Sequence, residues 1–143
     1  MSRNTAMKRY NLLMTDIEAT YHEASRKLGL SDSAMLILYT VCYNGKKCLL
    51  NDITRSSGIS KQTINSALRK LEAEDIVRLE SMGRRKKTVH LTDKGKVFAH
   101  NTVHKVLMIE DAIFDSWTES EQITYLELTQ KFLTTLKCKV AEL

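Results

Sequence analysis

Residues 58–95, GISKQTINSALRKLEAEDIVRLESMGRRKKTVHLTDKG, decide the fold that we expect for this chain. Ser60 is a suitable N-cap for a helix, because its hydroxyl can accept a backbone N–H of the first turn. The apolar positions of this helix are Ile64, Leu68 and Leu71, and spacings of four and three place them on one inward face. The outward face is polar and carries Lys61, Gln62, Asn65, Ser66 and Arg69.

Two short segments after this helix alternate apolar and polar residues, over 76–80 and 88–91. That pattern is typical of paired β-strands with one face in water. Between them lie residues 81–87, with Gly83 at the bend and a basic run from Arg84 to Lys87. A capped helix followed by a basic hairpin therefore predicts a surface for a polyanion.

The distribution of charge agrees with this interpretation. The chain has 143 residues and a formal net charge of +5. From Ser60 to Lys96 there are ten Lys/Arg and five Asp/Glu, whereas the rest of the chain has twelve of each. The whole basic excess thus lies in the central stretch, as phosphate binding requires. The length and the 43% hydrophobic content predict a single globular domain with a real core.

The cysteines and the N-terminus narrow the class of protein further. Cys42, Cys48 and Cys138 are odd in number and widely spaced, so neither a disulfide framework nor a zinc knuckle is expected. The first residues lack an apolar signal core, and no run of about 18 apolar residues could span a bilayer. We therefore expect a cytoplasmic protein with reduced thiols and no membrane partner.

The flanking segments are predicted to be helical. A helix over residues 5–28 has one apolar stripe, and Ser31 caps a second helix, through Tyr43, that is apolar nearly all round. A short helix begins at Leu49 or Leu50 and ends at Ser57. Thr92 starts a long helix through about Ser116, and a capping box from Thr118 to Glu121 starts the last helix, which ends near Val140. The expected fold class is mainly α with a small β-wing.

The central motifs resemble those of a known family. Residues 53–64, ITRSSGISKQTI, resemble the bacterial helix-turn-helix pattern, and residues 84–95, RRKKTVHLTDKG, resemble the wing and following helix start of the MarR (multiple antibiotic resistance regulator) family. The match spans about residues 49–96, and the helix order extends it over nearly the whole chain. The ending LTDKG is its most specific part.

This resemblance implies a winged helix-turn-helix DNA-binding lobe over residues 31–92 and dimerisation helices over 1–30 and 93–143, in one MarR-like domain. It also implies a homodimeric transcriptional regulator, usually a repressor, that binds a pseudo-palindromic operator and responds to a small ligand. Three positions depart from the family pattern: Gly83 stands where Asp is usual, Asp75 where Gly is usual, and Thr54 where Ala is usual.

The expected partner is double-stranded DNA, with the helix in the major groove and the basic tip at the minor groove. The predicted DNA-binding residues are Ser60, Lys61, Gln62, Thr63, Asn65, Ser66, Arg69, Arg84, Arg85, Lys86 and Lys87. The alternative for each part alone is an ordinary polar surface helix or a solvated loop. Their succession at this spacing favours DNA binding.

Apolar stripes on the terminal helices predict a homodimer, because one helix-turn-helix unit reads only a few base pairs. The predicted dimer residues are Tyr10, Met14, Ile17, Ile113, Trp117, Leu133, Leu136 and Val140. The alternative is that they close a monomeric core. Residues 110–127 contain six acids and no Lys or Arg, so we expect this segment to point away from DNA.

The resemblance also implies a site for a small aromatic or phenolic effector, for which the candidates are Tyr21, Met35, Tyr39 and Tyr43. Aromatic and Met side chains at helical spacing also occur as plain core. Cys42 is interpreted as an inert buried thiol. Cys48 is the only thiol whose basic neighbours, Lys46 and Lys47, could lower its pKa.

Two other functions compete with ligand-controlled DNA binding. His100 and His104 are four residues apart, and zinc-sensing members of the family use His there, so a metal-sensing regulator is one alternative, with His22, Glu18 and Glu23 as further ligands. Two exposed histidines on a polar face are the simpler interpretation, and no metal site is predicted. A protein-interaction adaptor built on a winged helix is the other alternative. An enzyme is not expected, because no catalytic motif or phosphate-binding Gly-rich loop occurs, and no cofactor is predicted.

Overall fold

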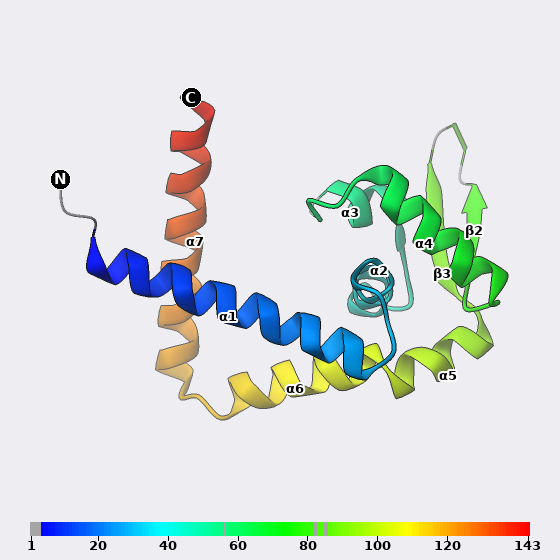
Figure 1. Cartoon of the computed structure of the whole chain (residues 1–143), viewed down its shortest axis with the longest axis horizontal. Helices are drawn as coiled ribbons and strands as arrows, with labels where there is room; N and C mark the ends of the chain where they lie inside the picture. The colour runs from blue at the N-terminus through cyan, green and yellow to red at the C-terminus, as the bar shows by residue number, and fades with distance from the viewer. Residues whose placement is uncertain (1–3, 56, 82, 85) are drawn as a thin grey trace. The chain divides into compact units, whose positions relative to one another are not determined.

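The computed structural model describes residues 4–143 except 56, 82 and 85. The chain divides into two compact units, Met1–Val106 and Leu107–Leu143, which are described separately. The fold is mainly helical with a small three-stranded antiparallel sheet, which confirms the predicted fold class (Figure 1). The helices are α1 Thr5–Lys27, α2 Asp32–Tyr43, α3 Leu50–Arg55, α4 Lys61–Ala73, α5 Asp93–Asn101, α6 Val103–Asp115 and α7 Glu119–Ala141. The strands are β1 Lys47–Leu49, β2 Val77–Ser81 and β3 Lys87–Leu91.

Hydroxyl caps set the starts of the helices as predicted. The Ser31 Oγ accepts the Ala34 N–H at 3.1 Å and begins α2. The Thr118 Oγ1 accepts the Glu121 N–H at 3.1 Å, and the Glu121 carboxylate accepts the Thr118 N–H at 3.0 Å. The predicted capping box is therefore present at the start of α7, where it satisfies backbone donors that a helix end leaves open.

The sheet has the order β1-β3-β2, and β1 was not predicted. In β1, Cys48 pairs with Val89 of β3, and both side chains are buried. The preceding Lys46 has a φ of 80°, and its carbonyl accepts the Leu91 N–H at 3.1 Å, which ties the start of β1 to the end of β3. A three-residue strand that continues directly into α3 has no periodicity that could reveal it.

Helix α2 lies in the middle of the core of the first unit, as its apolar sequence predicted. Ile37, Leu38 and Val41 of α2 have no exposed surface. They belong to one buried cluster with apolar residues of α3, α4, the sheet and α5. The amphipathic α4 packs on α2 and β2 and leaves its polar face in water.

The start of α5 lies close against the end of the α4–β2 connection. The Thr92 N–H donates to the Ile76 carbonyl at 3.1 Å, and the Thr92 Oγ1 caps α5 by accepting the Gly95 N–H at 2.9 Å. A Cβ built at Gly95 would overlap the same Ile76 carbonyl oxygen. Only glycine therefore permits this approach without displacing the backbone.

The single long helix predicted from Thr92 to about Ser116 is wrong. It is broken at Thr102, where φ is −126° and ψ is −96°, so α5 ends at Asn101 and α6 begins at Val103. The Thr102 hydroxyl donates to the Phe98 carbonyl at 2.8 Å within α5. Neither Gly nor Pro marks this break, so the sequence pattern predicts a continuous helix across Thr102.

The second unit is a helical corner with a separate aromatic cluster. The rings of Phe114 and Trp117 lie 4.9 Å apart, and those of Trp117 and Tyr125 lie 5.2 Å apart, between centroids. The Gln122 side chain also donates to the Phe114 carbonyl at 2.6 Å. These contacts join the end of α6 to the first turns of α7. All residues of α7 are described by the structure, and none of them is buried.

Candidate nucleic-acid interface

The α3–α4 segment is a helix-turn-helix whose inner faces are fixed by the core. Ile53 of α3 and Ile64 of α4 are essentially fully buried. The turn between them contains Gly58 with a φ of 67°, a left-handed conformation that favours glycine. The Ser57 Oγ accepts the Ile59 N–H at 3.1 Å and closes this turn.

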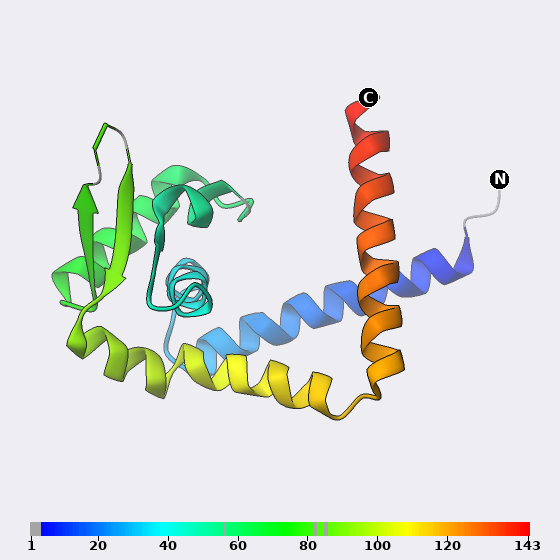
Figure 2. The ribbon, with the colours of Figure 1, turned by 180° about the vertical axis from the view of Figure 1, so that it is seen from behind.

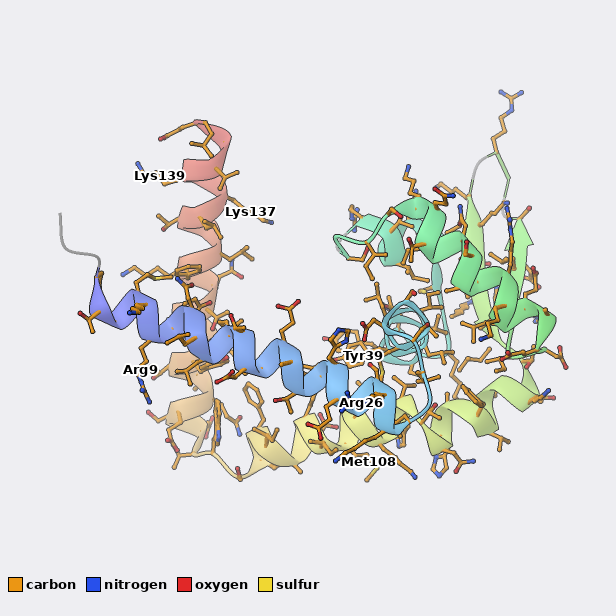
Figure 3. All side chains as sticks on the ribbon, in the orientation of Figure 1. Arg9, Arg26, Tyr39, Met108, Lys137 and Lys139 are labelled. Atoms are coloured by element: carbon orange, nitrogen blue, oxygen red, sulfur yellow. The ribbon has the colours of Figure 1, made fainter. Side chains whose placement is uncertain are left out.

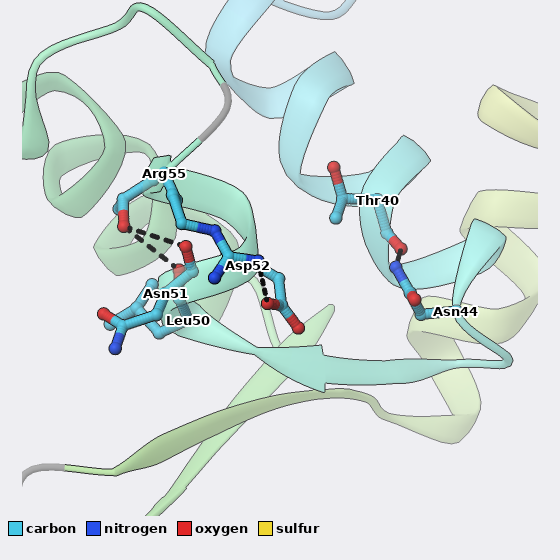
Figure 4. Close-up of polar contacts among 7 residues, drawn as sticks. Thr40, Asn44, Leu50, Asn51, Asp52 and Arg55 are labelled. Atoms are coloured by element: carbon cyan, nitrogen blue, oxygen red, sulfur yellow. Dashed lines mark hydrogen bonds and ion pairs between the residues drawn. The ribbon is translucent and has the colours of Figure 1, made fainter. Parts of the chain in front are cut away.

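Helix α3 is short and is held by local polar contacts. The Thr54 hydroxyl donates to the Asn51 carbonyl at 3.3 Å, and the Arg55 guanidinium lies 3.5 Å from the Asp52 carboxylate (Figure 4). At the end of α2, the Asn44 amide donates to the Thr40 carbonyl at 2.8 Å. Thr54 thus bonds within α3 where the family pattern has Ala, without disturbing the helix.

The predicted outward face of α4 is exposed along its whole length. The Ser60 Oγ accepts the Thr63 N–H at 3.2 Å and lies 2.9 Å from the Thr63 hydroxyl, so both side chains sit at the helix start. The exposed residues of this face are Lys61, Gln62, Asn65, Ser66 and Arg69. Because Ile64, Leu68 and Leu71 are buried on the other side, the polar face cannot rotate inward.

The hairpin of β2 and β3 carries the basic tip and projects beyond α3 and α4 (Figures 1 and 2). Gly83 has a φ of 75°, so the backbone there takes a left-handed conformation. Glycine adopts this conformation without the clash of a Cβ. The described basic residues of the tip, Arg84, Lys86 and Lys87, are exposed. Arg85 lies outside the described residues.

Strand β2, which leads to the tip, contains one acidic residue, Glu80. The Glu80 carboxylate lies 3.7 Å from the Arg78 guanidinium and 3.3 Å from Nε2 of His90. His90 Nε2 also lies 2.8 Å from the Thr88 hydroxyl. Glu80 thus pairs with side chains of the strands, so it does not neutralise the positive charge of the tip.

Asp75, the third departure from the family pattern, ends α4 with a φ of 60°. Its backbone thus adopts the left-handed conformation that glycine would supply. The Ile76 N–H then donates to the Leu71 carbonyl at 2.9 Å, which closes the helix end. Asp at position 75 therefore keeps the geometry of the turn, but its Cβ makes the left-handed backbone less favourable than it would be for glycine.

The effector candidates are spread over α1 and α2. Tyr39 and Tyr43 are stacked with ring centroids 6.2 Å apart, and Tyr43 is 73% exposed. Tyr39, which Figure 3 labels, and Met35 are half-buried on α2, and Tyr21 is exposed on α1. The structure therefore brings two of the four candidates into direct contact.

His100 and His104 are exposed, and their rings stack with centroids 5.3 Å apart. His22, named as a further ligand, instead has Nδ1 2.6 Å from the Asp32 carboxylate. Among the described residues, no group of three or more His, Cys, Asp or Glu side chains could hold a metal ion.

The expectation that basic neighbours lower the pKa of Cys48 is wrong. Burial raises the pKa of this thiol to about 11, and the nearby Asp52 carboxylate adds to the rise. Lys46 and Lys47 precede Cys48 in sequence, but the side chain of Cys48 points into the core. Burial also raises the pKa of Cys42, and the three cysteines are unpaired.

The predicted dimer residues are exposed in the single chain, with the half-buried Trp117 as the exception. They lie on α1 in the first unit and on α6, α7 and their connection in the second. Further exposed apolar side chains on α7 are Ile123, Tyr125, Leu126, Leu128 and Phe132. Within the part of the chain that the structure describes, no helix is long and apolar enough to cross a bilayer.

Comparisons with known proteins agree with this geometry. Residues 28–86 match the model of the MarR family. A search of curated proteins found no match. Among solved structures, a MarR family regulator from Neisseria meningitidis superposes with a TM-score of 0.81 at 16% identity, over 97% of this chain and 99% of that chain.

Two further solved structures carry bound partners. NadR in complex with 4-hydroxyphenylacetate has a TM-score of 0.70 at 14% identity, over 92% of this chain and 94% of that one. The MepR–DNA complex of S. aureus has a TM-score of 0.66 at 16% identity, over 94% of this chain and 99% of that one. This chain therefore has the fold of the MarR-family transcriptional regulators and carries the family's sequence pattern over residues 28–86, which confirms the resemblance inferred from its motifs.

Proposed function

We propose that this chain is a homodimeric transcriptional repressor that binds a pseudo-palindromic DNA operator and is released by a small ligand. Residues 31–92 form the DNA-binding lobe, and residues 1–30 and 93–143 form the dimerisation region. Helix α4 enters the major groove, and the basic wing contacts the adjacent minor groove.

The observation that carries the proposal is the exposed polar face of α4, which the core holds outward beside a basic hairpin. Gln62 and Asn65 have the amide groups that pair with adenine edges, and Arg69 can reach guanine or phosphate. Ser60 and Lys61 lie at the helix N-terminus, where backbone N–H groups favour a phosphate. In S. aureus MepR, a protein of the same fold forms a DNA complex.

The charges of α7 support pairing with a second copy. The first half of α7 carries Glu119, Glu121 and Glu127, and the second half carries Lys131, Lys137 and Lys139. A two-fold axis across the helix would place two copies antiparallel, with the acidic half of one beside the basic half of the other. The exposed apolar side chains of α7 would then be covered.

An effector would act on α1 and α2, where Tyr21, Met35, Tyr39 and Tyr43 are the candidates. NadR, which has the same fold, was solved with a phenolic acid. Aromatic side chains with one polar end suit such a ligand.

The test is binding to duplex DNA as a function of salt. Each phosphate contact contributes a slope of about −0.9 to log K against log[salt]. We expect Arg84→Ala/Lys86→Ala to weaken binding at least about tenfold and to reduce the slope by about two. The matched control is Lys27→Ala/Lys105→Ala, which removes two exposed positive charges outside the lobe and outside the charge pairing of α7 and should leave the slope unchanged.

Absence of binding to operator and generic DNA at low salt would contradict the proposal and favour the alternative of a protein-interaction adaptor. The best operator candidate is the DNA that flanks the protein's own gene, where footprinting would find a symmetric protected site. A stable monomer at micromolar concentration in light scattering would contradict the dimer.

A further inference from the structure

The outer face of the sheet carries a chain of polar contacts that joins β2 to β3, inside the unit Met1–Val106. In the antiparallel register, Arg78 pairs with His90 and Glu80 pairs with Thr88. Val89, between the two β3 residues, is fully buried and belongs to the core. Because side chains alternate along a strand, the four polar residues share the opposite face.

The contacts determine which nitrogen of His90 carries a hydrogen. The Thr88 hydroxyl donates to the Glu80 carbonyl at 3.5 Å, so its oxygen can accept. Nε2 of His90 lies 2.8 Å from this hydroxyl and 3.3 Å from the Glu80 carboxylate, which has only acceptor atoms. Two acceptors beside one nitrogen require Nε2 to be the donor.

The two contacts of Glu80 differ in strength. The side chains of Arg78 and Glu80 are 64% and 51% exposed, and an exposed pair at 3.7 Å contributes little. The side chain of His90 is only 17% exposed and Thr88 is buried, so the contact with His90 is screened less by water. The contact between the strands is therefore the one that can hold the hairpin.

Glu80 also offsets a row of basic groups. It is the only acid in the three strands, all of which the structure describes in full. His90 lies between Lys47 of β1 and Arg78 of β2, its direct partners in the register. Like charges directly opposite each other destabilise a sheet. Without Glu80, this row has no opposing charge in the strands.

These contacts lie close to the basic tip of the hairpin. One further residue pair, Ser81 and Lys87, lies between them and the tip. Because twist accumulates along a hairpin, the orientation of one pair influences the next. We propose that Glu80 and His90 are positioning residues, whose contact across the hairpin sets the direction in which the tip meets the duplex. This role rests on the proposed function.

The first experiment measures binding of a labelled duplex at low salt with two substitutions that separate charge from position. Glu80→Gln removes a negative charge, so by charge alone it should tighten DNA binding. Glu80→Asp keeps the charge but shortens the side chain by a methylene, so charge alone predicts no change. A positioning role predicts that both variants bind about threefold more weakly. Binding as tight as that of the wild type, or tighter, in either variant would overturn the proposal.

The salt dependence separates positioning from a loss of stability, and urea melts show that each variant is folded. We expect the salt slope of Glu80→Gln to fall by about one, because a tip cation loses its phosphate although the charge of the chain has risen. The matched control is Glu72→Gln, which removes the same charge from the exposed side of α4. It should bind at least as tightly as the wild type, and weaker binding would contradict the argument from position.

A double-mutant cycle tests whether the two residues act through one contact. His90→Phe keeps a ring but removes the donor, so it should weaken DNA binding about as much as Glu80→Gln. The double variant should then bind no more weakly than either single variant. Additive losses would mean that the two side chains act independently and would overturn the proposal.

The second experiment tests the contact without DNA. Imidazole ¹⁵N shifts of the labelled full chain should show Nε2 of His90 as a protonated nitrogen. A hydrogen on Nδ1 alone would overturn the proposed contact. Absence of all DNA binding by the wild type, with Nε2 protonated, would instead contradict the proposed function.

Discussion

Helices α4 and α7 are both amphipathic, yet they differ in what covers their apolar faces. Ile64 and Leu68 of α4 are at most 2% exposed, because α2 and the sheet lie against them. Every apolar side chain of α7 is at least partly in water, and the helix is described completely. The inner face of α4 is therefore covered within its own unit, whereas the apolar side chains of α7 are exposed, and we propose that a second copy covers them. Stability and assembly should respond to different residues.

The largest expected effect is on the covered helix. Leu68→Ala removes buried methyl groups and leaves a cavity, so it should lower the free energy of unfolding by about 3 kcal/mol. Urea denaturation at a fixed protein concentration measures this loss. Arg69→Ala, one residue on and exposed, should change stability by less than about 0.5 kcal/mol while it weakens DNA binding. A similar loss for both variants would mean that α4 is not anchored by its inner face.

The next effect concerns the uncovered helix. Leu133→Ala should raise the dissociation constant of the dimer about 30-fold, equivalent to about 2 kcal/mol of lost apolar burial. Sedimentation at several concentrations measures it. Cys138→Ala, five residues on and therefore on another side of α7, should leave dimerisation unchanged. Equal dimer affinity in both variants would place the interface elsewhere.

A smaller effect concerns the capping box at the start of α7 and not the apolar side chains of this helix. The backbone N–H of Thr118 and the Thr118 side chain lower the pKa of the Glu121 carboxyl. A lowered pKa in the folded state means stabilisation that is present above the ordinary glutamate pKa and is lost as pH falls through the folded value. Glu121→Gln should therefore remove part of the acid dependence of stability, seen by comparing wild-type and variant melts from pH 7 to acid. Parallel profiles would show that the charge of Glu121 does not stabilise the start of α7.

The smallest expected effect concerns backbone strain at Asp75, in the lobe of residues 31–92. Asp75 has a φ of 60°, and glycine adopts this backbone without the clash of a Cβ. Asp75→Gly should raise the free energy of unfolding by about 0.5 kcal/mol, net of the greater freedom of glycine in the unfolded chain. Denaturant melts of the two proteins decide it. A destabilised variant would show that the Asp75 side chain contributes to the lobe.

The lobe was predictable because its signals are local. Ser60 is followed by apolar residues at helical spacing, and alternation marks the strands of the wing. The break at Thr102 was missed because its flanking residues continue a helical pattern. The raised pKa of Cys48 was missed because neighbours in sequence, Lys46 and Lys47, do not determine where a strand residue points.

The candidate site likewise has a part that the sequence predicts and a part that it does not. The outward face of α4 follows from which residues are apolar, so its exposed residues could be named from the sequence alone. The contacts of Glu80 with Arg78 and His90 could not, because they depend on the register of β2 against β3. The sequence likewise predicts the apolar side chains of α7 but not what covers them.

Gly95, the last residue of LTDKG, gives this sequence pattern an unexpected meaning. It is buried, has no side chain to offer DNA, and is required because a Cβ would collide with the carbonyl of Ile76. The most specific part of the motif thus records backbone clearance where a helix meets a strand. LTDKG is therefore a signal for the packing of α5 against the α4–β2 connection, and it contains none of the predicted DNA-binding residues.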